Sequence, residues 1–320
     1  MATPRSGYGR VPEKSACSRK NWCVMNSVGP VSRRSFTLGA LNIGTGLLAL
    51  GAASEALPGV AGAPPPGLPN LALPANNLRA LVRMTASLQE RDVPWWYDGT
   101  IFGVVPGENP RPLFKFEGME LYWMQHLPGG AYELTGNTVT FFRDVNTGEM
   151  LSEFRNPYTK AVNPVMPAIQ GGGPGRGFNY SVKGIRFTRL LDQLPEDPLV
   201  LDWTFARDMV WLHNWTRYPP GLPPPRWQQQ TMFASQKDFL DEKLDSIPVV
   251  FGSTVHMPWL KWLDMGDRPG HLVWHAGGAK LKSIDELPGE YRRRAEKEYP
   301  ALLSADPAKA ADRVLPPHPQ

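Results

Sequence analysis

Residues 132–155 read YELTGNTVTFFRDVNTGEMLSEFR, and this stretch decides the fold class. Asn146-Thr147-Gly148 separates the apolar pair Phe141-Phe142 from Met150-Leu151. An Asn and a Gly between two apolar runs are typical of a hairpin turn. Asn156-Pro157 then ends the second run. The stretch therefore predicts two antiparallel strands closed by turns.

The same pattern extends in both directions, because short aromatic and β-branched runs cut by Gly, Pro and Asn continue from Trp95 to about Val255. No alternation of strands and helices is visible, so the sheet is expected to be antiparallel and either to close on itself or to pack as a sandwich. We expect a mainly β fold, namely one antiparallel, barrel-like (lipocalin-like) domain with a few peripheral helices. The expected strands are Trp95–Val105, Leu113–Leu127, Tyr132–Arg143, Gly148–Arg155, Phe178–Arg189 and Leu199–Trp215.

Three helices are expected around this sheet. Asn76-Asn77 predicts the start of an amphipathic helix that ends near Glu90. A short helix is expected in Ser235–Leu244 and a charged one in Asp285–Leu302. The apolar stripe of the first helix consists of Leu78, Leu81, Val82, Met84 (in part) and Leu88.

The N-terminal region resembles an export signal. Ser32–Leu38 reads SRRSFTL, and Leu38–Ala53 carries no charge, which indicates a twin-arginine signal recognised by the export machinery that carries folded proteins. The alternative is a chance basic dipeptide before a hydrophobic core helix. The run is too short and too rich in small residues to span a bilayer, which takes about 20 apolar residues. We therefore expect a periplasmic protein that is exported folded, with no stable membrane anchor.

The chain is expected to divide at the ends of this signal. Met25 is the expected initiator, so residues 1–24 are interpreted as a gene-start artefact and 25–63 as the signal peptide. Small residues at Ser54 and Ala56, or at Ala61 and Ala63, offer two cleavage sites. A Pro-rich linker over 64–75, a single β-rich domain over 76–305 and a disordered tail over 306–320 complete the expected organisation.

Charge and cysteine content argue against several functions. The chain has 34 Lys and Arg against 30 Asp and Glu, with a pI of about 9.0. Seven of the basic and two of the acidic residues lie in residues 1–63, so the remainder carries 27 against 28 and no basic surface for nucleic acid is expected. The two cysteines, Cys17 and Cys23, also lie there, which excludes disulfides, thiolate metal sites and a cysteine nucleophile from the predicted mature chain.

The run Leu199–Trp215, if it is one strand, places Arg207 and His213 on an aromatic face. Burying either side chain there is unfavourable unless it is paired or bound, so a barrel interior built for a ligand would explain both. Arg207 would then anchor a carboxylate and His213 would move a proton, with Asp208 or Asp202 as a partner. The alternative is a bent strand in which Arg207 reaches the rim and His213 is a hydrogen-bonded core residue. That face reads Leu199, Leu201, Trp203, Phe205, Arg207, Met209, Trp211, His213 and Trp215.

Clustered tryptophans beyond residue 94 predict an aromatic-lined pocket, although a tryptophan-rich core would need no ligand. His126 is the alternative to His213 as general acid or base, with Tyr97 or an Asp as its partner. The residues expected to bind substrate are Trp96, Trp123, Trp203, Trp211, Arg186, His256 and Trp259.

The histidines do not show metal-ligand spacing. His271 and His275 lie on an expected strand, where residues four apart are about 13 Å from each other, too far to share one ion. His126 and His256 stand alone in sequence, so no metal and no cofactor are expected, although ligands assembled across strands stay open. Gly171–Gly177 (GGGPGRG) lacks the Lys-Ser/Thr of a phosphate-binding loop and is expected to be a flexible loop.

Several of these motifs together resemble a known family. They are Trp96-Tyr97-Asp98-Gly99, the FRDVNTG run over 142–148, Asn156-Pro157-Tyr158-Thr159 and the Pro269-Gly270-His271-Leu272 to Gly278-Lys280 ending. The chain is similar in these to the bacterial family catalogued as domain of unknown function 1838, and its leader resembles those of twin-arginine-exported members. Thr159-Lys160 departs from the Thr-Gly of that family. The resemblance would cover about residues 76–300; it implies a single domain and no activity.

Together these features favour an exported enzyme without a cofactor, a lyase such as a decarboxylase or an isomerase, acting on a small aromatic or hydrophobic acid. The second hypothesis is a periplasmic binding or carrier protein that performs no chemistry on the same kind of small molecule. The third is a metal-dependent enzyme with histidine ligands from several strands.

Overall fold

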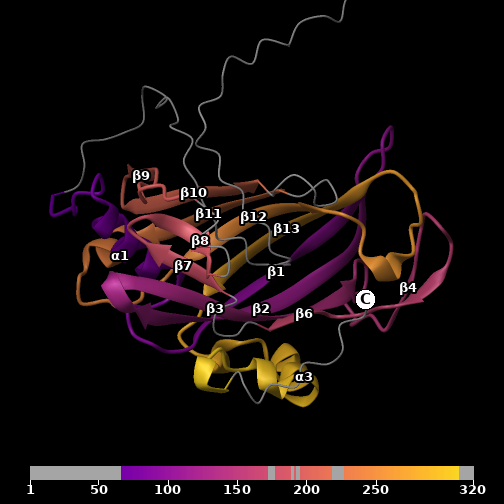
Figure 1. Ribbon diagram of the computed structural model, residues 1–320. Helices are drawn as coiled ribbons and strands as arrows, with labels where there is room; N and C mark the ends of the chain where they lie inside the picture. Colours follow the sequence, from indigo (N-terminus) through magenta and orange to yellow (C-terminus); the bar gives the residue numbers. More distant parts are fainter. Residues whose placement is uncertain (1–65, 172–176, 189–190, 192–194, 218–226, 310–320) are drawn as a thin grey trace, which may run out of the picture. The chain divides into compact units, whose positions relative to one another are not determined.

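The computed structural model describes residues 66–171, 177–188, 191, 195–217 (without the side chains of 215–217) and 227–309. This part of the chain is mainly β, and its large sheet is antiparallel at every ladder (Figure 1). Eleven strands form that sheet in the order β8-β7-β3-β2-β1-β13-β12-β11-β10-β9, with β6 paired to β3 beside this path, while β4 and β5 pair separately. The strands are β1 Val93–Val104, β2 Arg111–Leu127, β3 Ala131–Asp144, β4 Glu153–Arg155, β5 Val162–Pro164, β6 Ala168–Gly171, β7 Phe178–Ser181, β8 Gly184–Phe187, β9 Trp203–Ala206, β10 Met209–Arg217, β11 Trp227–Ser235, β12 Val250–Met257 and β13 His271–Lys280.

The remaining elements are short helices. The α-helices are α1 Pro74–Thr85, α2 Gln236–Leu240 and α3 Gly289–Glu298. The 3-10 turns are η1 Pro128–Gly130, η3 Lys261–Leu263, η4 Ile284–Glu286, η5 Pro300–Leu302 and η6 Pro307–Lys309. The expected helices at Ser235–Leu244 and Asp285–Leu302 are confirmed as α2 and as η4–α3–η5, with Ser235 capping α2 through a hydrogen bond from the Asp238 amide.

The two faces of the sheet bury different helices. We call the face that packs against α1 the inner face and the face that packs against α3 the outer face. Tyr291 of α3 lies against Trp96 and Phe141 of the outer face, and its hydroxyl donates to the Val139 carbonyl at 2.6 Å. Helix α3 lies beside β2, β3 and β6 in Figure 1.

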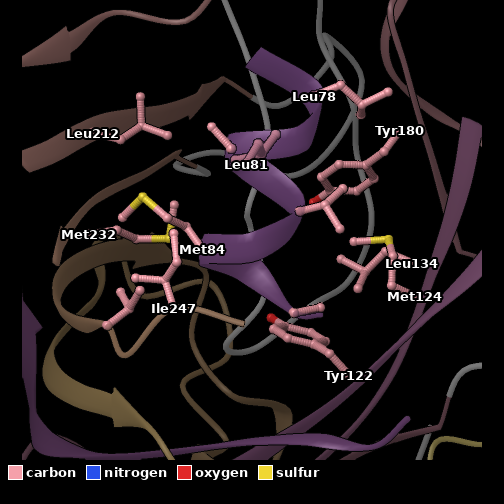
Figure 2. Close-up of a cluster of buried hydrophobic side chains, with 14 of the residues drawn as sticks. Leu78, Leu81, Met84, Tyr122, Met124, Leu134, Tyr180, Leu212, Met232 and Ile247 are labelled. Atoms are coloured by element: carbon pink, nitrogen blue, oxygen red, sulfur yellow. The ribbon is translucent and has the colours of Figure 1, made fainter. Parts of the chain in front are cut away.

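Helix α1 is surrounded by strands from both ends of the sheet. Figure 2 shows Leu78, Leu81 and Met84 of α1 between one group of side chains from β2, β3 and β7 and another from β10, β11 and the segment before β12. Because both ends of the sheet contact the same helix, the sheet must curve around α1. The helix is therefore buried on nearly all sides, whereas a single buried apolar stripe was expected. The labelled neighbours are Tyr122, Met124, Leu134 and Tyr180, and Leu212, Met232 and Ile247.

Buried polar side chains fix this helix at both ends. The Asn77 amide oxygen accepts from the Leu201 amide and the Trp203 indole at 2.9 and 2.8 Å. The Arg83 guanidinium donates to the carbonyls of Leu244 and Phe239 at 2.7 and 3.0 Å, and also to those of Asp238 and Asp241. All four acceptors belong to α2 and the loop after it, so Arg83 ties α1 to residues far along the chain.

The C-terminal carbonyls of α1 also have partners from the sheet. The Lys280 ammonium donates to the carbonyls of Arg83 and Ala86 at 2.7 and 3.3 Å, and the Trp95 indole donates to that of Thr85 at 2.9 Å. A cation is favourable at this end of a helix, where the carbonyl groups point outward. Burial, together with repulsion from Arg91 and Arg83, lowers the pKa of Lys280 well below its ordinary value.

The start of this helix differs from the expectation. The N-cap is Leu73, followed by Pro74 at the first helical position, and Asn76 and Asn77 lie inside the helix. Asn77 instead uses its side chain to bind the β9 region, so a polar residue that was interpreted as a cap is a tertiary anchor. The helix also ends at Thr85 rather than near Glu90.

The prediction of one strand over Leu199–Trp215 is wrong. Residues 203–206 and 209–217 form a hairpin, β9–β10, in which Phe205 pairs with Val210 and Trp203 with Leu212. Arg207 lies in the turn with a φ of +54°, a left-handed conformation that a continuous strand does not contain. The turn resets the alternation of side chains, so the residues of the predicted face do not share one face. Residues 178–189 are likewise divided into the β7–β8 hairpin.

The turn at Asn146-Thr147-Gly148 is confirmed. Gly148 has a φ of +75° and its amide donates to the Asp144 carbonyl at 3.0 Å, while Arg143 and Met150 form a bridge. The expected strand 148–155 contains regular structure only in β4. Of the loop Gly171–Gly177, residues 172–176 lie outside the described residues.

The described strands do not form a closed barrel. β8 and β9 end the strand order, and the described residues 195–202 between them contact the β7–β8 hairpin without completing a ladder. In this segment the amides of Asp197 and Leu199 donate to the carbonyls of Lys183 and Val182 at 3.0 and 3.1 Å. Leu199 is buried in the cluster around α1, so this connection forms part of the core.

Candidate functional site

A hollow lies on the inner face of the central strands, and the strand pairing shows which residues surround it. Paired residues in adjacent strands share a face, so Phe251, Gly278, Tyr97, Gly118 and Thr140 form one row across β12, β13, β1, β2 and β3. The next row in the direction away from α1 contains Ser253, Ala276 and Phe116. The hollow holds about 370 Å³ of empty space, including space open to solvent. We call it the inner pocket, and its lining is Tyr97, Phe116, Phe251, Ser253, Val255, Met257, Trp274 and Ala276.

Two glycines make room for the aromatic side chains of the inner pocket. A Cβ on Gly118 would collide with the ring of Tyr97, and a Cβ on Gly278 would collide with the Trp96 carbonyl oxygen and with the ring of Phe251. Each ring therefore extends over a glycine of the neighbouring strand and lies close to the sheet. This arrangement leaves the volume above the rings open, and it requires a residue without a side chain at both positions.

The aromatic walls are arranged edge to face. The ring centroids of Phe116 and Trp274 lie 4.9 Å apart with an interplanar angle of 61°, and Tyr97 lies 6.1 Å from Phe116. Such pairs are favourable because the ring edge is positive and the ring face negative. An aromatic ligand would meet the same two kinds of surface.

Tyr97 provides a hydroxyl at this site. Its hydroxyl lies 2.8 Å from that of Thr140, and the side chain is buried. Burial, together with the nearby carboxylate of Glu120, raises the pKa of Tyr97 well above its ordinary value of 10.0. The phenol is therefore neutral over the physiological range and acts as a hydrogen-bonding group there, not as a base.

Three buried polar atoms around the inner pocket have no hydrogen-bond partner among the described residues. They are the indole nitrogen of Trp274 and the side-chain oxygens of Gln228 and Gln230, whose residues are 3%, 1% and 6% exposed. Gln228 pairs with Val255 and Gln230 with Ser253, so both glutamines flank the lining residues of β12 on the same face. Buried polar groups are nearly always paired, so a ligand can supply the missing partner of Trp274, which lines the pocket, while the two glutamines lie on the adjacent strand beside the lining.

A family model described as "Protein of unknown function (DUF1838)" matches residues 90–314. The chain belongs to this family. Every lining residue of the inner pocket lies within the DUF1838 region, whereas α1 precedes it. The match begins at residue 90 instead of the expected 76. No curated protein and no solved structure matches the chain.

Arg207 and His213, the pair predicted to act on the substrate, both lie within the DUF1838 region but do not line the inner pocket. Arg207 and Asp208 are exposed in the β9–β10 turn. His213 is exposed and pairs with Thr231 on the outer face, where its Nδ1 lies 2.9 Å from the threonine hydroxyl. The premise that a single face carries Arg207 and His213 among aromatic side chains is therefore wrong.

The predicted tryptophans lie apart from one another. Trp203 packs near α1 and binds Asn77, while Trp211 lies on the outer face, tilted against Phe233 at 6.3 Å. Trp96 and Trp123 pack into the outer cluster beneath α3. These four side chains therefore behave as core or surface residues, and none of them lines the inner pocket.

The other predicted site residues are also outside the pocket. His126 is exposed at the end of β2, where its Nε2 lies 2.8 Å from the Leu88 carbonyl. Arg186 of β8 donates to the Leu191 carbonyl at 3.3 Å, and the indole of Trp259 donates to that of Arg268 at 3.2 Å. Of the twelve predicted site residues, Tyr97 alone lines the pocket as the described residues define it.

Sequence reasoning missed two features of this region. The inner pocket uses Phe116, Phe251 and Trp274, which share a face because of strand pairing that no local pattern reveals. The second feature is an outer-face pair, His256 and His271, whose Nδ1 and Nε2 lie 3.1 Å apart although the residues are 15 apart in sequence. The offset of adjacent strands brings these two together, while His275 lies one row away and contacts the Thr254 hydroxyl at 3.2 Å.

Larger metal clusters and membrane spans are not found in the described part of the chain. It contains no group of three or more His, Cys, Asp or Glu side chains that could hold a metal ion. None of its helices has both the length and the apolar character needed to cross a membrane.

Proposed function

We propose that this protein binds a small, neutral, ring-bearing molecule in the inner pocket. The observation that carries the proposal is the combination of aromatic walls with buried polar atoms that lack partners, at Trp274, Gln228 and Gln230. Ligand pockets typically pair an apolar lining with a few polar groups that orient the ligand. A carbonyl or hydroxyl oxygen of the ligand would accept from the Trp274 indole, and a ligand N–H or O–H would donate to a glutamine oxygen.

The pocket chemistry favours a neutral molecule over the expected acid. The lining includes no carboxylate, lysine, arginine or histidine, and Tyr97, its one titratable group, is held neutral. An ionised ligand would lose its hydration without gaining a counter-charge, which is strongly unfavourable in an apolar cavity. Arg207, the expected carboxylate anchor, lies in an exposed turn.

Ligand-observed NMR with single-ring molecules tests this proposal. Phenol, which is neutral and carries one hydroxyl, is expected to bind, and benzoate, a charged analogue of similar size, is expected to bind at least tenfold more weakly. Ala276→Leu places a larger side chain in the pocket and is expected to remove phenol binding. Ala279→Leu makes the same change on the outer face of β13 and is expected to leave binding intact. Equal binding of phenol to both variants would contradict the proposal.

A second candidate is catalysis at the same site, a lyase or isomerase reaction on the bound molecule. The neutral Tyr97 hydroxyl next to Thr140 favours it, because a buried phenol can donate a hydrogen bond to negative charge that develops on a bound substrate. Incubation with a ligand that co-purifies from the native host separates the two functions. A ligand recovered unchanged supports binding alone. Turnover that is lost in Tyr97→Phe while binding persists supports catalysis.

We further propose that this function is carried out outside the cytoplasm. We also propose that the curved sheet forms a barrel-like enclosure around α1. The paired Arg33-Arg34 before an uncharged run supports twin-arginine export, with the export machinery as the transient partner. Replacing both arginines with lysine and fractionating the native host tests this part. Retention of the variant in the cytoplasm is the expected result, and equal export of variant and parent would contradict it.

A further inference from the structure

The His256–His271 pair lies on the outer face, away from the inner pocket. His256 lies in β12 and His271 at the start of β13, and their facing nitrogens are 3.1 Å apart with ring centroids 5.1 Å apart. In this state one ring donates an N–H to the other. The two imidazoles therefore bring one nitrogen each within 3.1 Å of the other.

The spacing of these nitrogens suits a shared metal ion. An ion bound at 2.0–2.1 Å from two nitrogens 3.1 Å apart would subtend an N–metal–N angle of about 100°. This value lies between the octahedral and tetrahedral angles. The tautomer of the donating ring must change, because its proton moves to the other ring nitrogen when the metal binds.

The surroundings keep the pair ordered and neutral. Trp227 stacks on the opposite side of His256 at 4.2 Å with an interplanar angle of 20°, which restricts the orientation of this imidazole. Burial lowers the pKa of both histidines, and the proximity of His271 lowers that of His256 further. Neutral imidazoles are the form that binds metals, so the pair does not have to lose a proton near neutral pH.

We propose that His256 and His271 form a bidentate site for a divalent first-row transition metal, with water in the remaining positions. Imidazole ligands suit Cu²⁺, Ni²⁺ and Zn²⁺, and Cu²⁺ binds such donors most tightly. The site is separate from the inner pocket, so it can exist whether or not the pocket binds a ligand.

Copper titration of the full chain tests this site. Cys17, Cys23 and His318 are first replaced with Ser, Ser and Asn, because they would compete for the metal. One Cu²⁺ per chain is expected, with two nitrogen couplings in its electron paramagnetic resonance spectrum. His256→Asn and His271→Asn are each expected to weaken binding at least tenfold. Tryptophan fluorescence is expected to fall on titration, since Trp227 stacks on one ligand.

His275→Asn provides the matched control, since His275 lies on the same face and strand as His271 but outside the pair. It is expected to bind Cu²⁺ as tightly as the parent chain. Circular dichroism identifies a variant that fails to fold, and the second histidine variant then decides the question. The inference would be overturned if both pair variants bound Cu²⁺ as tightly as the parent, or if the His275 variant lost binding to the same extent.

Discussion

The ring of Tyr97 occupies the space above Gly118, where any side chain on β2 would stand. The absence of a side chain at Gly118 of β2 therefore allows Tyr97 of β1 to line the inner pocket. The same arrangement recurs between Phe251 and Gly278. The pocket therefore depends on glycines that do not line it.

Gly118→Ala is expected to lower the free energy of unfolding by about 1–3 kcal/mol, because the added methyl group displaces the buried ring of Tyr97. Urea denaturation measures the change. Gly252→Ala is the control, since a Cβ there meets its nearest neighbour, the Ala276 carbonyl, at 4.0 Å. This control is expected to be neutral or slightly stabilising. Equal stability of the two variants would show that Tyr97 can move without penalty.

Arg83→Met is expected to destabilise the fold by about 2–4 kcal/mol, because the carbonyls around α2 lose their charged donor and stay buried. Arg79→Met lies four residues earlier in the same helix on an exposed position and is expected to change stability by no more than about 0.5 kcal/mol. Thermal and urea unfolding of both variants checks the difference. A loss confined to the exposed position would refute the role of Arg83 as an anchor of α1.

Gln228→Met is expected to raise the free energy of unfolding by about 1 kcal/mol, because it removes a buried oxygen that has no partner among the described residues. The same change is expected to weaken phenol binding. Gln229→Met, on the exposed outer face of the same strand, is expected to alter neither property. A destabilised Gln228 variant would instead indicate that its side chain has a structural partner.

Stability is expected to fall as the pH drops below about 6.5. The pKa values of His256 and His271 lie below that ordinary value, so the unfolded chain binds protons before the folded chain does. The contribution of this pair to the free energy of unfolding is fully present above pH 6.5. It is lost as the pH falls through the lowered pKa values. The outer-face positions beside the pair include Trp227, Thr254 and Val273, which do not titrate in this range.

Urea midpoints at pH 8, 6 and 5 measure this dependence. His271→Asn is expected to flatten it, because one lowered pKa is removed and His256 loses its repulsive neighbour. His275→Asn is expected to keep the pH dependence of the parent chain. An unchanged slope in the His271 variant would assign the acid sensitivity to other groups.

Local patterns in the sequence predicted the kind of fold but not its curvature. Turn residues such as Asn146 and Gly148 set hairpins through their own backbone preferences, so the antiparallel, mainly β character could be predicted. The position of α1 could not, because its burial depends on strands from both ends of the sheet. The β9–β10 turn was missed because Arg207 occupies its left-handed position, where a glycine or asparagine would have indicated a turn.

The candidate site was harder to predict for a related reason. Tyr97 was predicted as a partner in acid–base chemistry, yet Trp274, Phe251 and Phe116 join it in the pocket through pairings β12–β13, β13–β1 and β1–β2. Of these, the β13–β1 pairing joins residues 167 to 185 positions apart, so it is a property of the whole sheet. Where a long-range register decides which residues meet, as for His256 and His271, a single sequence shows the residues but not their contact.

The contact between Lys280 and the end of α1 joins residues 197 positions apart. A ribosome adds about 5–20 residues per second, so α1 waits about 10–40 s for the strand that completes its surroundings. During synthesis the carbonyls of Arg83 and Ala86 lack this partner, and β1, at the centre of the sheet, lacks β13 on one edge. The nascent chain thus depends on β13 to complete the polar contacts at the end of α1, and a chain cut short before Lys280 would leave those carbonyls without their ammonium donor.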